Sequence, residues 1–157
     1  MTDEKNKNFK NSLAIVFKHE GGFSDDPNDK GGRTNFGITQ STYNDYCKRH
    51  NLKTKDVKEL TKEEASDVYF NDYWKASGAD KINNEIEALI LFDTAVLHGV
   101  GRAKQFYNKS NGDSNKMLEL RKEHYAKKVE SDPTQNRFLK GWNNRVNNLY
   151  KILNEYK

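Results

Sequence analysis

Three residues near the N-terminus, Glu20, Asp29 and Thr34, have the types and spacing that acid catalysis needs. Glu20 follows an apolar segment, and desolvation disfavours the charged form of a carboxyl group, so we expect Glu20 to stay protonated near neutral pH. Asp29 lies among Gly, Asn and Lys residues, where we expect it to stay ionised. A protonated carboxyl paired with an ionised one is typical of glycosidic bond cleavage. Thr34 adds a hydroxyl group that could orient a water molecule or the partner carboxylate.

The same acidic loop allows other interpretations. Asp25, Asp26 and Asp29 could be solvated turn residues, because Asp-Pro, Asn-Asp and Gly-Gly pairs are turn signals. A calcium-binding loop is disfavoured, because Pro27 occupies a ligand position and the pattern of alternating acids with a closing glutamate is absent. The residues by themselves leave the catalytic loop and the solvated turn as alternatives.

We expect a helix directly before this loop, with Glu20 at its end. Four apolar residues before it recur at the spacing of one helical face: Phe9, Leu13, Val16 and Phe17. Gly21 and Gly22 then predict a helix stop, so Glu20 is expected at the C-terminal end of a packed helix. No helical period follows until Ile38, and we expect short strands at 22–24 and 35–38.

Two helices are expected in the next part of the chain. Thr39 is predicted to be the N-cap of the first, whose buried face carries Tyr43, Tyr46 and Cys47. Thr61 and Glu64 form a capping-box pattern for the second, which should reach Tyr73 or Trp74.

The second half of the chain predicts a buried helix with further helices around it. Residues 83–99 are apolar nearly all round, which is typical of a central buried helix, here ended by Gly99. A short helix is expected at about 103–109. Asp113 or Ser114 should begin another, and the Asp132-Pro133 pair should begin the last.

Together, these elements predict a mainly α domain of the α+β class. It would have six or seven helices around one central helix, with a small irregular β lobe near residues 22–38. A length of 157 residues fits a single domain. The apolar content of 34% and the mean hydropathy of −1.08 are low. Two Trp, eight Tyr and eight Phe compensate, because aromatic side chains bury large areas.

Composition also argues against several classes of site and of protein. The single Cys47 excludes a disulfide framework and a zinc site built on several thiolates. No segment has the length and apolar character of a membrane span, and the first twelve residues lack the apolar core of a secretory signal. The net charge of +4 and pI of about 9.0 attract polyanions, but interleaved acids disfavour a nucleic-acid binder.

Four residues are candidates for contact with substrate. Tyr73 and Trp74 could stack on sugar rings, and core packing is the alternative for both. His98, at the end of the buried helix, could face the substrate or serve as a cap. Asn35, inside the acidic motif, is the fourth candidate.

Asp93 lies inside the apolar segment, where an unpaired charge would be costly. Arg121 or Arg145 is the expected partner. We therefore predict a structural ion pair rather than a catalytic role for Asp93.

Residues 20–39 closely resemble the N-terminal motif of glycoside hydrolase family 108. That motif runs Glu-Gly-Gly-aromatic, two residues, Asp-Pro, a further Asp, Gly-Gly and Thr-Asn-aromatic-Gly-Ile-Thr. It is matched here by Glu20-Gly21-Gly22-Phe23, Asp26-Pro27, Asp29, Gly31-Gly32 and Thr34-Asn35-Phe36-Gly37-Ile38-Thr39. Weaker similarities continue to about residue 150, at Tyr69, Tyr73-Trp74, Phe92-Asp93-Thr94-Ala95-Val96, Gly99, Arg121, Tyr125, Gly141-Trp142 and Arg145.

This resemblance implies a lysozyme-like fold and an N-acetylmuramidase that acts on bacterial peptidoglycan glycan strands, as in many phage endolysins. Glu20 would be the catalytic acid, with Asp29 and Thr34 completing the set. Residues 9–75 would form the catalytic part, and residues 80–157 would correspond to a segment often described as peptidoglycan-binding. A lytic transglycosylase on a similar fold and a non-catalytic wall-binding module are the alternatives.

The expected protein is a monomer that uses no cofactor or metal and binds no nucleic acid. It would be made in the host cytoplasm without a signal peptide and would reach the wall by assisted release.

Overall fold

The structure, a computed structural model, describes residues 3–20 and 33–156. The chain divides into two compact units, Met1–Ala76 and Ser77–Lys157. Among the described helices, none combines the length and apolar character that crossing a membrane needs. The strand predicted at 22–24 lies outside the described residues.

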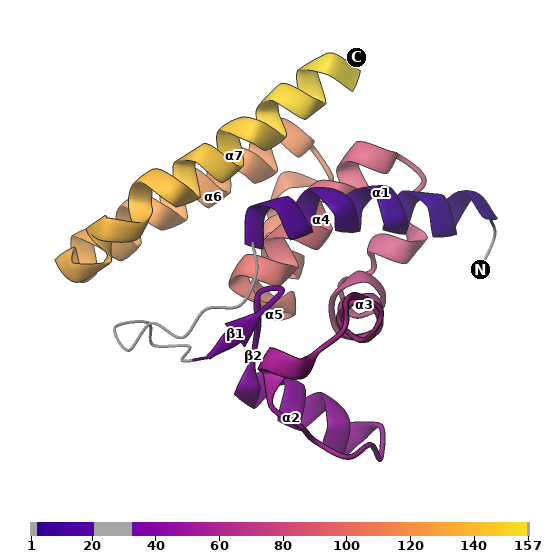
Figure 1. Cartoon of the computed structure of the whole chain (residues 1–157). Coiled ribbons are helices and arrows are strands. Elements are labelled where there is room, and N and C mark those ends of the chain that lie inside the picture. The colour runs from indigo at the N-terminus through magenta and orange to yellow at the C-terminus, as the bar shows by residue number, and fades with distance from the viewer. Residues whose placement is uncertain (1–2, 21–32, 157) are drawn as a thin grey trace. The chain divides into compact units, whose positions relative to one another are not determined.

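Helix α1 (Asp3–Glu20) begins the first unit and ends at Glu20, as predicted (Figure 1). Its buried face carries Phe9, Leu13 and Val16, which confirms the helical spacing seen in the sequence. The Phe9 ring packs edge-on against Trp74, with ring centroids 5.5 Å apart. Apolar packing therefore fixes the helix that ends in the candidate acid.

A two-stranded hairpin follows, with β1 (Thr34–Asn35) antiparallel to β2 (Ile38–Thr39). The prediction of one strand over 35–38 was wrong, because Phe36 and Gly37 form the turn between two shorter strands. Both turn residues have positive φ, +54° and +78°. This is the backbone of a type I′ turn, whose twist matches that of the paired strands.

Two predicted helix starts are confirmed in the first unit. Thr39 caps α2 (Gln40–Arg49) by accepting a hydrogen bond from the Thr42 amide. The capping box of Thr61 and Glu64 begins α3 (Lys62–Tyr69), after the 3-10 turn η1 (Val57–Glu59).

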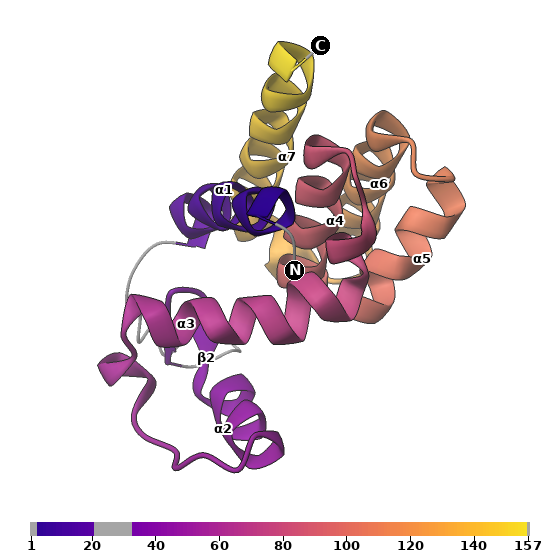
Figure 2. The same ribbon diagram turned by 90° about the vertical axis from the view of Figure 1, so that its right-hand side faces the viewer.

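Helix α3 continues without a break into a π-helical segment, η2 (Phe70–Lys75) (Figure 2). The predicted helix thus reaches Trp74, but its last turns are wider than those of an α-helix. Such wider turns change the face on which the following side chains lie, and they occur often at functional sites. Tyr73 and Trp74 both lie in this segment.

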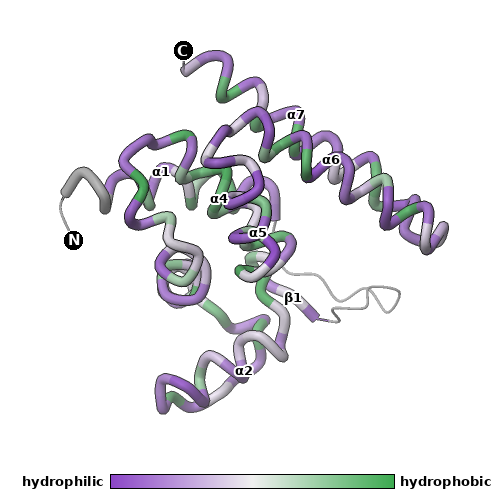
Figure 3. Tube along the Cα trace, turned by 180° about the vertical axis from the view of Figure 1, so that it is seen from behind, coloured by the Kyte–Doolittle hydropathy of each residue, from purple (hydrophilic) through white to green (hydrophobic). Residues whose placement is uncertain are grey.

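Helix α4 (Glu85–His98) is the core of the second unit. It is hydrophobic over most of its length (Figure 3), and residues 88–95 are all buried. Gly99, with φ of +92°, ends it as predicted. The other elements of this unit are η3 (Ala79–Lys81), α5 (Val100–Ser110), α6 (Ser114–Ser131), η4 (Pro133–Gln135) and α7 (Asn136–Tyr156).

Helices α5, α6 and α7 all pack against α4, so the prediction of helices around a buried central helix holds for this unit. Helix α5 begins at Val100, earlier than the predicted 103, because Gly99 serves both as the end of α4 and as the cap of α5. Asp113 caps α6 as predicted. The cap at Asp132 and Pro133 begins the 3-10 turn η4, which leads into α7.

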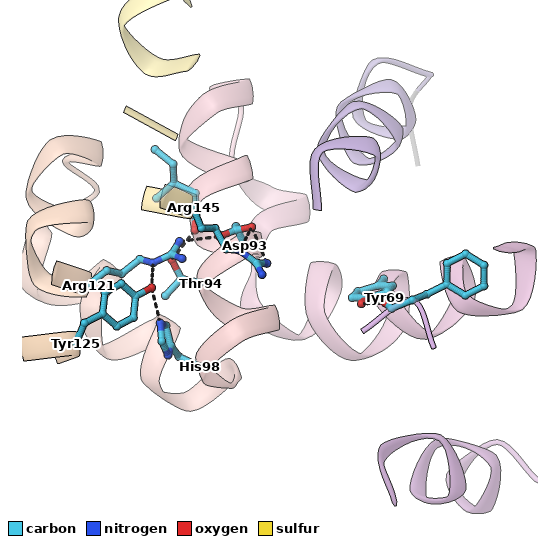
Figure 4. A network of polar contacts seen from close by, with 9 residues as sticks. Tyr69, Asp93, Thr94, His98, Arg121, Tyr125 and Arg145 are labelled. Atoms are coloured by element: carbon cyan, nitrogen blue, oxygen red, sulfur yellow. Dashed lines mark hydrogen bonds and ion pairs between the residues drawn. The ribbon is translucent and has the colours of Figure 1, made fainter. Parts of the chain in front are cut away.

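A buried ion triad joins three of these helices. Asp93 on α4 is fully buried and lies 2.7 Å from Arg121 Nη1 and 2.9 Å from Arg145 Nη2 (Figure 4). The predicted structural pairing is confirmed, with both arginines as partners rather than one. Because the two guanidinium groups come from α6 and α7, the carboxylate ties both helices to α4.

We expect Asp93→Asn to destabilise the protein by about 3–5 kcal/mol, because it leaves two buried cations without their counter-charge. The matched change Asp45→Asn removes an exposed carboxylate, paired with Arg49 at 3.1 Å, and should change the stability little. Urea denaturation of both variants measures the difference. Equal free energies of unfolding for the two would contradict the structural role of the triad.

Candidate active site

The Glu20 side chain packs directly against the backbone of the hairpin turn. A Cβ atom built on Gly37 would lie 2.6 Å from Glu20 Oε2 and 2.8 Å from Glu20 Cδ, closer than real atoms approach. A larger residue at position 37 would therefore have to displace the Glu20 side chain, and the φ of +78° also favours glycine there. Glu20 is half-buried, and its carboxyl group lies against the turn at Gly37.

The hairpin that covers Glu20 also carries Thr34. Thr34 is half-buried and stands opposite Thr39 in the two-stranded register. The structure therefore places Thr34 on the element that contacts the candidate acid. Asp29 lies outside the described residues, and its place in the set remains a prediction from the motif.

The base of the hairpin is tied to the segment before α3. Asn35 is 7% exposed, and its side-chain amide donates to the carbonyl oxygen atoms of Val57 at 3.1 Å and Lys58 at 3.3 Å. Arg33 forms an ion pair with Asp56 at 2.7 Å. These contacts give Asn35 a structural task, with both amide hydrogens directed to backbone.

Tyr73 lies within electrostatic reach of Glu20. Burial is the largest cause that raises the pKa of the Tyr73 hydroxyl, and the negative charges of Asp72 and Glu20 raise it further. Its ring is half-buried and lies 5.6 Å from the ring of Tyr69. The structure thus brings Glu20, the hairpin and Tyr73 together within the first unit.

Trp74 packs in the core, which was the alternative to stacking on a sugar ring. It is only 1% exposed, and its ring is enclosed with that of Phe9. A ring with no accessible face cannot stack on a sugar in this conformation. Its neighbour Tyr73 is half-buried, and its contact with substrate remains a prediction.

His98 belongs to the second unit and ends α4. Its Nε2 lies 2.9 Å from the Tyr125 hydroxyl, which in turn accepts from Arg121 Nε at 3.1 Å (Figure 4). Burial, followed by the positive charge of Arg121, lowers the pKa of His98 to about 2. His98 is therefore neutral and is linked through Tyr125 to the ion triad; its contact with substrate remains a prediction.

Two residues of the site were not singled out from the sequence. Gly37 was only part of a motif, because the Phe36-Gly37 pair is not one of the usual hairpin-turn signals. Tyr69 was named only among the weaker similarities to the family, and its hydroxyl group donates to the Phe36 carbonyl oxygen. No sequence pattern pairs these two residues, because they lie on separate elements.

The comparisons with known proteins agree with this geometry. The family model described as Glycosyl hydrolase 108 matches residues 13–99, more than half of the chain. The chain belongs to this family, and it is therefore a glycoside hydrolase. The matched residues include Glu20, the hairpin and Tyr73.

A solved structure, that of SagA from Brucella abortus, is similar to this chain. The two are 28% identical, the TM-score is 0.73, and the alignment covers 92% of each chain. The lysozyme-like, mainly helical fold expected from the sequence is thus supported over nearly the whole length. No curated protein matches the sequence.

The neutral state of His98 predicts a pH-dependent stability. In the unfolded chain the group takes up a proton below about pH 6.5, whereas in the folded protein it stays neutral, so stability is lost as the pH falls below 6.5. The contribution has an upper limit of about 1.4 kcal/mol per pH unit.

Urea unfolding of wild type and of His98→Gln, at pH 7.5 and at pH 5.0, measures this contribution. Glutamine stays neutral at both pH values and can still hydrogen-bond to Tyr125, so we expect the variant to lose less stability than wild type on acidification. Equal losses would show that His98 titrates alike in the folded and unfolded states.

Proposed function

We propose that the protein hydrolyses the β-1,4 bond between N-acetylmuramic acid and N-acetylglucosamine in bacterial peptidoglycan, with Glu20 as the proton donor. The observation that carries the proposal is the packing of the half-buried Glu20 carboxyl against the glycine turn of the hairpin. Family membership adds that the chain is a glycoside hydrolase.

The position of Glu20 suits a general acid. Proton donation needs a carboxyl group that is held in one orientation and partly shielded from water. The end of a packed helix supplies the first requirement, and contact with the Gly37 backbone supplies part of the second. The proton passes from the carboxyl oxygen to the oxygen of the leaving sugar as the glycosidic bond breaks.

Asp29 and Thr34 are proposed to act on the opposite face of the sugar ring. In an inverting reaction the second carboxylate activates a water molecule, which requires a carboxyl separation of roughly 6.5–9.5 Å. Thr34, at the base of the hairpin whose turn contains Gly37, would help to orient this water. The role of Asp29 rests on its place in the motif.

Tyr73 is the proposed sugar-stacking residue, because it combines partial exposure with nearness to Glu20. The net charge of +4 would favour adherence to anionic wall polymers. Action on the wall after assisted release, as a phage endolysin, belongs to the same proposal.

Glu20→Gln should lower wall hydrolysis by at least about 100-fold, because glutamine fills the same space but cannot donate the proton. The matched control is Glu59→Gln, the same change at an exposed position of η1. Loss of turbidity of purified cell wall measures activity. Mass spectrometry of the digest should find reducing muramic acid ends. Full activity of Glu20→Gln would refute the acid assignment, and anhydro-muramic ends would indicate a transglycosylase.

Gly37→Ala should lower activity by at least about tenfold, because the new methyl group displaces the Glu20 carboxyl from its position. Gly78→Ala is the control: its φ is +90°, yet nothing lies within 4 Å of the added atom. Both changes carry a similar backbone cost of about 1 kcal/mol. We therefore expect similar losses of stability and unequal losses of activity; equal activities would contradict the contact.

A further inference from the structure

We propose that the Tyr69 hydroxyl group is a positioning element for Glu20, acting by holding the Phe36 carbonyl so that the hairpin turn stays against the Glu20 carboxyl. This inference rests on the proposed function, in which Glu20 is the proton donor. Tyr69 touches neither substrate nor the reacting atoms in this proposal. It acts through the turn.

The contact itself joins two separate elements. Tyr69 is the last residue of α3 and is 1% exposed, so its hydroxyl group has little access to water. The hydroxyl donates to the carbonyl oxygen of Phe36, the first residue of the turn. Because a buried hydroxyl group needs a partner, this hydrogen bond fixes the turn relative to α3.

The turn needs such a restraint. Phe36 has φ of +54°, a left-handed conformation that bulky residues rarely adopt. Strained backbone of this kind persists where the surroundings hold it in place. The next residue is Gly37, whose backbone meets the Glu20 carboxyl, so relaxation at Phe36 would move the surface that orients the acid.

Aromatic packing holds the same three elements together. The Phe17 ring lies 5.4 Å from the Phe36 ring and 5.5 Å from the Tyr69 ring. Phe17 precedes Glu20 by nearly one helical turn on α1. The rings hold the turn in its general place, and the hydroxyl hydrogen bond adds the directional restraint on the carbonyl.

The test is Tyr69→Phe, which keeps the ring packing and removes only the hydroxyl group. On soluble, uncross-linked glycan strands we expect kcat to fall about tenfold while KM changes less than twofold. Tyr46→Phe is the matched control, because it removes the hydroxyl of another buried tyrosine of this unit, one bonded to Asn71 at 3.1 Å. That variant should keep wild-type kcat.

A double variant separates positioning from general destabilisation. If Tyr69 acts by way of the turn and Glu20, then Tyr69→Phe should lower kcat less than twofold when Gly37→Ala has already displaced the carboxyl. A kcat within twofold of wild type for Tyr69→Phe would overturn the proposal. Equal losses for Tyr69→Phe and Tyr46→Phe, or full additivity with Gly37→Ala, would also overturn it.

The two levels of the proposal fail in different ways. Full activity of Glu20→Gln would refute the proposed function together with the inference. An inactive Glu20→Gln combined with an unaffected Tyr69→Phe would refute the inference alone.

Discussion

The contact between the Glu20 side chain and the backbone of Gly37 is the constraint on which the candidate site depends. It requires a helix that ends at residue 20, a turn with two positive φ values and a residue without a Cβ atom at its tip. The hairpin is only two residues long on each side. Such a short element is not stable alone, so its neighbours must hold it in place.

Different interactions hold the elements of the two units together. In the first, aromatic rings and backbone-directed hydrogen bonds secure a small hairpin between α1 and α3. In the second, the apolar helix α4 accepts one buried carboxylate, Asp93, which is compensated by two arginines. The first arrangement holds the hairpin turn against the Glu20 side chain, and the second holds three helices together through one buried carboxylate.

Sequence patterns predicted the helices well because their signals are local. Apolar spacing placed α1 and α4, and side-chain capping placed the starts of α2 and α3. The turn at Phe36 and Gly37 was missed, because a phenylalanine in a left-handed conformation has no local signal. The π-helical segment was missed for the same reason, since its composition suits an ordinary helix.

The sequence by itself determined the family, because residues 20–39 match its motif almost continuously, and it determined that Asp93 needs a cation. Only the tertiary structure decided that both arginines pair with Asp93, that Trp74 is enclosed while Tyr73 is half-buried, and that the Tyr69 hydroxyl donates to the turn. The physical reason is that these outcomes depend on which elements meet in space. Residue spacing along one helix or strand does not show which distant elements will pack against that helix or strand.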